Sequence, residues 1–157
     1  AFLMGPVSEP RMENRELCSF PLIWVASPDL KLPKRRLDLE DLAEWPIVTY
    51  ARNTKPFAEI SQKFSQLDEL PARFYSSSSL AACRRLTIDG IGVSTLPLSV
   101  IADELKNGQL VRLNTAWTPS QLEFTASYPN VPFNPVAELA ANLAVGISKA
   151  YSETPDN

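Results

Sequence analysis

The sequence predicts an α/β fold, and two observations support this prediction. Short apolar runs rich in β-branched residues alternate with stretches of helical periodicity. The run Pro21–Ala26 is almost continuously apolar, as expected for a strand that is covered on both faces. Of the 157 residues, 45% are hydrophobic and 21% are charged, which is ordinary for a globular chain. This length suffices for one good core or for two small lobes.

The first part of the chain contains three apolar runs bounded by turn residues. Ala1–Met4 is expected to form a buried strand, because a Gly-Pro pair ends its apolar run. Pro21–Ala26 and Pro46–Tyr50 are expected to be the next two strands. Between these two, Asp38 is expected to cap a short helix, with Asp41 three residues later as the acid of a capping box.

The middle of the chain repeats the alternation. After the polar turn Ala51–Thr54, Pro56 near a first turn and apolar residues at helical spacing predict a helix. Ala72–Tyr75 is expected to be a strand, and the serine run Ser76–Ser79 offers several N-caps for a helix over Leu80–Asp89. The glycine that follows is expected to end this helix.

The last part contains three predicted strands and two predicted helices. The strands are Ile91–Leu96, Leu110–Leu113 and Leu122–Tyr128. The helices are Leu98–Leu105 and an amphipathic helix over Pro135–Tyr151, which Asn134 caps. The predicted inner face of the last helix consists of Val136, Leu139, Leu143 and Ile147.

Charge and composition argue against several classes of function. The formal net charge is −3, and no basic run exceeds three residues, so the chain is not expected to bind DNA by itself. Histidine is absent from the sequence, and the cysteines are far apart, so neither a metal nor a cofactor is expected. We expect Cys18 and Cys83 to be buried free thiols in a reducing cytosol, with a regulatory disulfide or a peroxide-sensing thiol as the alternatives. Neither a membrane span nor a secretion signal is expected, which favours a cytoplasmic protein.

Four stretches resemble the effector-binding domain of LysR-type bacterial transcription regulators. They appear in the order expected for that family and cover nearly the whole chain. The stretches are PLIWVASPD, LDLEDLAEWPIVTY, SSSSLAACRRLTIDGIGVSTLP and VIADELKNGQLVRL. The resemblance implies a type II periplasmic-binding-protein-like fold, in which two Rossmann-like lobes are joined by two crossing strands.

The resemblance also implies a domain organisation. Lobe II is expected over residues 17–120 and complete, whereas lobe I is expected to be partial, formed by residues 1–16 and 121–151. Residues 152–157 are expected to be a flexible tail. A winged helix-turn-helix and on the order of 60 residues of lobe I are expected to lie outside the sequence. We expect self-association through an open strand edge and the apolar face of Leu122–Tyr128, unless the native chain supplies the rest of the lobe.

The turn after Pro46–Tyr50 carries the candidate binding residues. Doubly wound sheets bind ligands beyond the carboxyl ends of their strands, near helix N-termini. Neutral donors and one forked cation at such a place suit a small anion, with a carboxylate as the natural guest. The alternative is that Asn53 and Thr54 only cap a helix and that Arg52 is solvated. The resemblance places effector contacts in the same turn and at a rim in lobe I, and the candidates are Thr49, Tyr50, Arg52, Asn53, Thr54, Gly5 and Pro6.

Two groups outside the turn are expected to be structural. Ser94 and Thr95 lie on a predicted strand, where hydroxyls more often form local hydrogen bonds than face a crevice. The three tryptophans, Trp24, Trp45 and Trp117, are expected to pack in the core or at its edge rather than to form a stacking platform.

The expected function is ligand sensing rather than catalysis. A small effector between the lobes would change lobe closure and thereby control a DNA-binding module outside this sequence. A homodimer or tetramer is expected, with residues 72–75 and 80–89 as the candidate contact that the resemblance implies. The alternative is a transport-associated solute-binding protein of the same fold. An enzyme is not expected, because the sequence shows no nucleophile–base pair, metal cluster or phosphate loop.

Overall fold

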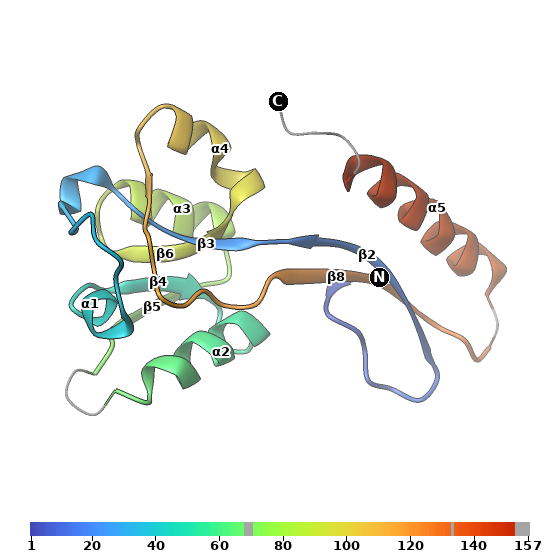
Figure 1. Cartoon of the computed structure of the whole chain (residues 1–157). Coiled ribbons are helices and arrows are strands. Elements are labelled where there is room, and N and C mark those ends of the chain that lie inside the picture. Colours follow the sequence, from blue (N-terminus) through green and yellow to red (C-terminus); the bar gives the residue numbers. More distant parts are fainter. Residues whose placement is uncertain (68–70, 133, 153–157) are drawn as a thin grey trace. The chain divides into compact units, whose positions relative to one another are not determined.

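The computed structural model describes residues 1–67, 71–132 and 134–152. The chain divides into two compact units (Figure 1). Unit 1 combines Ala1–Phe20 with the chain from Gln121 onward, and unit 2 is Pro21–Ser120. The division falls four residues after the predicted start of lobe II. Of the predicted tail, Ser152 is the last residue of a helix, and residues 153–157 lie outside the described residues.

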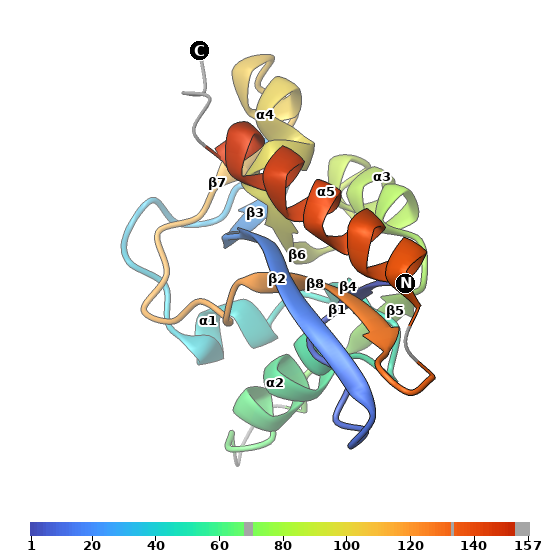
Figure 2. The same cartoon turned by 90° about the vertical axis from the view of Figure 1, so that its right-hand side faces the viewer.

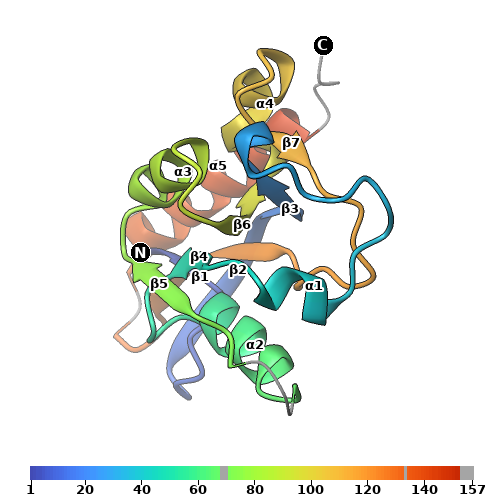
Figure 3. The ribbon, with the colours of Figure 1, turned by 90° about the vertical axis from the view of Figure 1, so that its left-hand side faces the viewer.

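Unit 2 is built on a five-stranded mixed sheet with the order β5-β4-β6-β3-β7. Strand β4 runs parallel to both β5 and β6, whereas β3 runs antiparallel to β6 and to β7 (Figure 3). The strands are β3 (Leu22–Ala26), β4 (Ile47–Tyr50), β5 (Phe74–Ser77), β6 (Val93–Pro97) and β7 (Val111–Arg112).

Helices cover both faces of this sheet, so unit 2 has three layers. Helices α1 and α2 pack one core cluster, around Trp24 and Phe64, against one face. Helices α3 and α4 pack a second cluster, around Cys83 and Ile101, against the other face. The helices are the 3-10 helix Pro28–Leu30, α1 (Leu39–Ala43), α2 (Lys55–Phe64), α3 (Leu80–Ile88) and α4 (Leu98–Lys106).

Local chemistry sets several of these boundaries as predicted. Asp38 and Asp41 form the reciprocal capping box of α1, because each side chain accepts a hydrogen bond from the other residue's backbone N–H. Gly90 adopts a φ of +73° just after α3 and ends the helix there. The tryptophans pack as expected, with Trp24 1% exposed and Trp45 and Trp117 partly buried against the same core.

The predicted strands of unit 2 all differ from the observed ones by one or two residues at their ends, and the strand expected over Ile91–Leu96, for example, is Val93–Pro97. The strand expected over Ala72–Tyr75 is Phe74–Ser77, because its partner β4 pairs Ile47 with Phe74 and Tyr50 with Ser77. Its last two residues are therefore serines that were expected to be caps, and Ser79 alone of the run caps α3. The strand expected over Leu110–Leu113 is reduced to Val111–Arg112.

Unit 1 contains an antiparallel three-stranded sheet and one long helix. The strand order is β1-β8-β2, with β1 (Phe2–Met4), β8 (Leu122–Pro129) and β2 (Met12–Phe20). Helix α5 (Pro135–Ser152) lies along this sheet (Figure 2). Strand β2 was not predicted, because its charged and polar residues lack the apolar alternation of a half-buried strand.

Three predictions for unit 1 were wrong. Strand β1 is exposed rather than buried, with Phe2 65% exposed. Strand β8 is not open, because β1 and β2 pair with its two edges and α5 packs on Ala126 and Tyr128. Helix α5 packs on that sheet through Ala137 and Ala141. Its predicted inner residues are therefore exposed by 60–74%: Val136, Leu139, Leu143 and Ile147.

Within the described part of the chain, none of the helices has the length and apolar character needed to cross a lipid bilayer.

Candidate functional site

The candidate turn, Ala51–Thr54, follows the carboxyl end of β4 in unit 2. Because β4 and β6 are parallel neighbours, their carboxyl ends meet at one edge of the sheet. The turn leads directly into α2, so the start of that helix lies at the same edge. Strand order and helix position therefore create the type of edge at which α/β sheets bind ligands.

Thr54 is the N-cap of α2. Its Oγ1 accepts a hydrogen bond from the backbone N–H of Phe57 (3.4 Å) and donates one to the carbonyl of Ala51 (2.7 Å). The structural role that the sequence allowed for Thr54 is therefore present. The Thr54 hydroxyl already forms both of these hydrogen bonds, so it could bind a ligand at this edge only if one of them were broken.

Arg52 and Asn53 are exposed at the tip of the turn. The Arg52 guanidinium carbon lies 5.9 Å from the centroid of the Phe57 ring, which places the cation over the first turn of α2. Within the described residues, the side chain of Asn53 forms neither a hydrogen bond nor the helix cap. Both side chains therefore offer donors to solvent or to a ligand.

Thr49 and Tyr50 form the buried end of β4. The Tyr50 hydroxyl donates a hydrogen bond to the carbonyl of Thr95 (3.0 Å) and ties β4 to β6. Burial raises the pKa of Tyr50 well above its ordinary value, so the phenol remains protonated. Tyr50 thus positions the ends of β4 and β6, and its hydroxyl proton is donated to Thr95 rather than available to a ligand.

Three buried polar groups at this part of the sheet have no partner among the described residues: Trp24 Nε1, Thr49 Oγ1 and Thr95 Oγ1. Trp24 pairs directly with Thr95 across β3 and β6, so their side chains project from the same face. The parallel register, which pairs Val48 with Ser94, places Thr49 next to Thr95 on that face. All three residues are about 1% exposed.

The expectation of local hydrogen bonds for Ser94 and Thr95 was wrong, because neither hydroxyl has a partner in the described part of the chain. An unpaired buried donor costs free energy of about 1–3 kcal/mol, so each such group calls for a physical reason. Sequence reasoning treated Trp24 as packing alone. It does pack, with its ring 6.1 Å from that of Phe64, but its indole N–H is free.

Gly5 and Pro6 belong to unit 1. Gly5 has a φ of +84°, its N–H donates to the carbonyl of Glu123 (2.8 Å), and its own carbonyl accepts from Thr125 Oγ1 (2.8 Å). Pro6 lines a cavity of about 460 Å³ together with Asn14 and Thr125. Of the two candidates of unit 1, Pro6 therefore lines this cavity, whereas Gly5 does not belong to its described lining.

The two cysteines differ in their environments. Cys83 is 1% exposed, its Sγ donates to the carbonyl of Thr49 (3.3 Å), and burial raises the pKa of its thiol. Cys18 is only half-buried and lines the 460 Å³ cavity of unit 1. Its predicted burial was wrong, because the ladder between β2 and β8 is irregular between Glu16 and Ser19.

Comparison with solved structures gives the fold. The regulatory domain of HypT from Salmonella typhimurium in its bromide-bound form superposes with a TM-score of 0.71 at 20% identity, covering 95% of this chain and 71% of that one. The regulatory domain of CcmR from Synechocystis PCC6803 in complex with 2-PG gives 0.73 at 14% identity, covering 94% and 72%. These likenesses confirm the predicted fold of a LysR regulatory domain.

Sequence comparison gives the family. The transcriptional regulator PtxR of Pseudomonas aeruginosa is 33% identical over 140 residues, which are 87% of this chain and 44% of PtxR. The HTH domain-truncated regulator QseD of Escherichia coli O157:H7 is 32% identical over 95 residues, which are 60% of this chain and 39% of QseD. The chain thus spans less than half the length of these relatives. The LysR substrate binding domain profile matches residues 1–140, and the chain belongs to this family.

Proposed function

We propose that the chain is the effector-sensing domain of a bacterial LysR-type transcription regulator, and that its effector is a small anion, with a carboxylate as the favoured group. The observation that carries the proposal is the set of unpaired donors on one face of the unit 2 sheet: Trp24 Nε1, Thr49 Oγ1 and Thr95 Oγ1. A ligand that accepts hydrogen bonds from these groups would remove the cost of leaving them unpaired.

The charges around the turn support an anion. Arg52 supplies a forked cation, and the start of α2 favours negative charge. The carboxylate of Glu59, on α2, accepts hydrogen bonds from the backbone N–H and the hydroxyl of Ser120. Two of the similar solved structures also support a small ligand: the HypT regulatory domain was solved with bromide and the CcmR regulatory domain with 2-PG.

Within the proposal, Thr49, Thr95 and Trp24, which are about 1% exposed in this structure, would reach the effector when the site opens, and Arg52 and Asn53 would close over it. Tyr50 and Thr54 would hold the strand end and the helix start in place. Gly5 and Pro6 would contribute from lobe I, which the proposal equates with unit 1. The lobes would be those expected from the sequence, with residues 17–120 as lobe II.

In the whole regulator, effector binding would shift the population between lobe arrangements and so act on a DNA-binding module. Such a shift needs differential affinity for the two states and no chemical step. The protein would work in the cytoplasm as a homodimer or tetramer. Residues 72–75 and 80–89 would supply a contact: β5 is the edge strand of its sheet, and Tyr75 is 49% exposed.

A thermal-shift screen of small organic acids tests the proposal. All three tryptophans lie in unit 2, so their fluorescence follows the unit that holds the turn. An acid at 100 times its Kd should stabilise the unit by about 2.7 kcal/mol. The shift should shrink in Arg52→Gln and persist in Lys106→Gln, which removes an exposed cation at the end of α4.

Two results would count against the proposal. One is a screen in which carboxylates of several shapes leave the unfolding midpoint unchanged. The other is an effector whose affinity is equal in Arg52→Gln and in the unaltered protein.

A further inference from the structure

Unit 2 contains a cavity of about 560 Å³ whose lining is rich in basic residues. Its walls come from the loop after β3 and from β7 with the residues that follow it. The volume lies within the range of small-molecule sites, which is about 300–1,000 Å³. Four cationic residues line it: Lys31, Lys34, Arg35 and Arg112.

This concentration of charge contrasts with the rest of the chain. The protein carries 15 Lys and Arg against 18 Asp and Glu, yet no Asp or Glu belongs to the described lining of this cavity. Arg35 is paired with Asp41 through two hydrogen bonds. Lys31, Lys34 and Arg112 have no ion-pair partner within the described residues. Cations held together without acids repel one another, and an anion would relieve that repulsion.

The walls between the cations are apolar. They consist of Pro28, Leu32, Pro33, Val111 and Leu113. Val111 is 38% exposed although it is a strand residue, so part of this wall is open to solvent. A guest that matches both features has an apolar body as well as a negative group.

The two walls are held together by backbone hydrogen bonds. The N–H of Leu37 donates to the carbonyl of Asn114 (2.8 Å), and the N–H of Ala116 donates to the carbonyl of Leu37 (2.8 Å). Leu37 is 1% exposed and anchors the loop in the core. Lys31 adopts a left-handed backbone conformation, with a φ of 53°, at the turn of this loop. The cavity is therefore preformed rather than a gap in a loose segment.

Strand directions separate this cavity from the candidate effector turn. Because β3 is antiparallel to β6 while β4 is parallel to it, the carboxyl end of β3 lies where β4 and β6 begin. The turn Ala51–Thr54 lies where β4 ends. The two places are thus at opposite edges of one sheet, separated by the four residues of β4, or about 13 Å.

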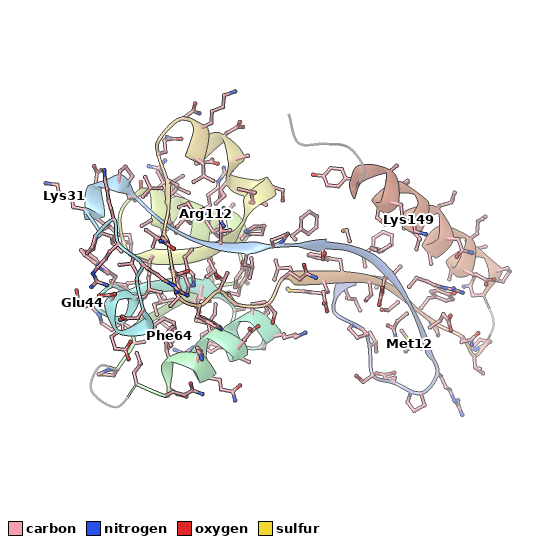
Figure 4. All side chains as sticks on the ribbon, viewed as in Figure 1. Met12, Lys31, Glu44, Phe64, Arg112 and Lys149 are labelled. Carbon is pink, nitrogen blue, oxygen red and sulfur yellow. The ribbon has the colours of Figure 1, made fainter. Side chains whose placement is uncertain are left out.

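We propose that this cavity binds a second ligand, an organic anion with an apolar chain or ring attached to a carboxylate. Lys34 and Arg112 hold the carboxylate from the two walls, and the side chains of Leu32 and Val111 cover the apolar body. Lys31 and Arg112 are labelled in Figure 4. The inference is independent of the effector proposal, because the sites share none of their residues.

The test uses the full chain labelled with ¹⁵N and three probes: decanoate, acetate and decyltrimethylammonium. Decanoate carries both the charge and the apolar body, acetate only the charge, and decyltrimethylammonium the body with the opposite charge. The expected result is that decanoate shifts the amide signals of residues 27–35 and 111–114, while the other two probes bind at least tenfold more weakly.

The matched variants are the doubles Lys34→Gln/Arg112→Gln and Lys106→Gln/Lys149→Gln. Both remove two positive charges, but only the first pair lines the cavity. The Kd of decanoate should rise at least tenfold in the first double variant and stay within twofold in the second.

Four results would overturn the inference. Amide shifts confined to the exposed face of α5 or to residues 49–54 would place the ligand elsewhere. Equal binding of acetate and decanoate would remove the apolar requirement. Absence of any shift, or equal Kd values in the two double variants, would remove the site.

Discussion

Gly92 lies so close to Pro46 that a Cβ at position 92 would stand 2.0 Å from the Pro46 carbonyl oxygen. That carbonyl accepts the N–H of Val93 (2.9 Å), so the contact begins the pairing of β6 with β4. This oxygen and the Pro46 carbonyl carbon, which would stand 2.8 Å from the same Cβ, belong to the backbone, so a side-chain rotation cannot relieve the overlap. Gly92→Ala should destabilise unit 2 by about 3 kcal/mol, measured by urea unfolding followed through tryptophan fluorescence.

The control for this prediction is Gly146→Ala, in the exposed middle of α5. A Cβ there would meet nothing within 4 Å, and alanine is the better helix former by about 1 kcal/mol. This variant should leave the tryptophan transition unchanged, since the tryptophans lie in unit 2. A Gly92→Ala protein as stable as the unaltered one would contradict the prediction, because it would show that β4 and β6 can move apart at this point without a loss of stability.

The acid sensitivity of unit 2 should depend on Asp41. The Arg35 guanidinium, and then the N–H of Asp38, lower the pKa of the Asp41 carboxyl from 3.8 to about 2. Because the folded-state pKa is the lower one, the stabilisation is present above pH 3.8 and is lost as the pH falls towards 2. Asp41→Asn should therefore lower stability at pH 7 and flatten the pH dependence between pH 4 and 2. Acid titration followed by tryptophan fluorescence measures both effects, and Glu40→Gln, in the same turn, should change neither.

Replacing Thr95 by Val should separate stability from binding. Valine has nearly the same shape and removes the unpaired hydroxyl, so unit 2 should gain about 1 kcal/mol while an effector loses a hydrogen bond. The same exchange at Thr87 is the matched control, because that buried hydroxyl donates to the carbonyl of Cys83 (2.8 Å) and its removal should bring no gain. Urea unfolding gives the stability. A loss of stability in Thr95→Val would mean that the hydroxyl is already satisfied.

The two thiols should react at different rates. Cys18 is half-buried and should react with 5,5′-dithiobis(2-nitrobenzoic acid) in the folded protein, whereas Cys83 is 1% exposed. Burial also raises the pKa of Cys83, so its reactive thiolate is scarcer at any given pH. One equivalent of dye should be released quickly at pH 8 and the second only in denaturant. Cys18→Ser should abolish the fast phase, and a fast phase that survives this substitution would contradict the assignment.

The outer face of α5 should drive self-association. Four large apolar side chains on it are 60–74% exposed, and exposed apolar patches of this kind mark interaction surfaces or aggregation sites. The unaltered chain should therefore show a concentration-dependent mass in sedimentation velocity. Leu139→Lys/Leu143→Lys should shift it towards the monomer, while Asn142→Lys, an exposed polar position on the same helix, should not. A monomer at all concentrations for the unaltered chain would remove this prediction.

Most of unit 2 could be predicted because its signals are local. The capping box of α1 depends on two aspartates three residues apart, and the glycine after α3 acts on the preceding turn alone. Helix α2 was expected from Pro56 and from apolar residues at helical spacing, of which Ile60 and Phe64 are buried. Such patterns lie within one or two turns of chain and need no knowledge of the tertiary structure.

The face of α5 could not be predicted, because the helix has two apolar faces. One carries large residues such as Leu139 and Leu143, and the other carries Ala137 and Ala141. Hydrophobicity alone predicts that the face with the larger residues is buried. The sheet packs instead against the alanines, which allow the helix to approach the large side chain of Tyr128 closely. Which face is chosen depends on the partner surface, and periodicity alone does not contain that information.

The site was predicted in part for a similar reason. The turn after β4 follows from the strand–turn–helix pattern, and Thr54 caps the helix as its position suggested. The cluster of Thr49, Thr95 and Trp24 depends on the register of three strands that are far apart in the sequence. The sequence does not show whether a strand hydroxyl has a hydrogen-bond partner, because that depends on which residues lie beside it in the neighbouring strands.

The pairing of Phe20 with Leu122 has a consequence for how the chain is assembled. Residues 21–121, which lie between them, begin and end beside each other, so β2 and β8 close a large loop that contains unit 2 with its own core. The entropy of closing a loop grows only slowly with its length, and unit 2 adds little to the cost of joining these strands. Residues 21–120 could accordingly be circularly permuted: a short linker would join Ser120 back to Pro21, and the new ends would be placed at a surface turn.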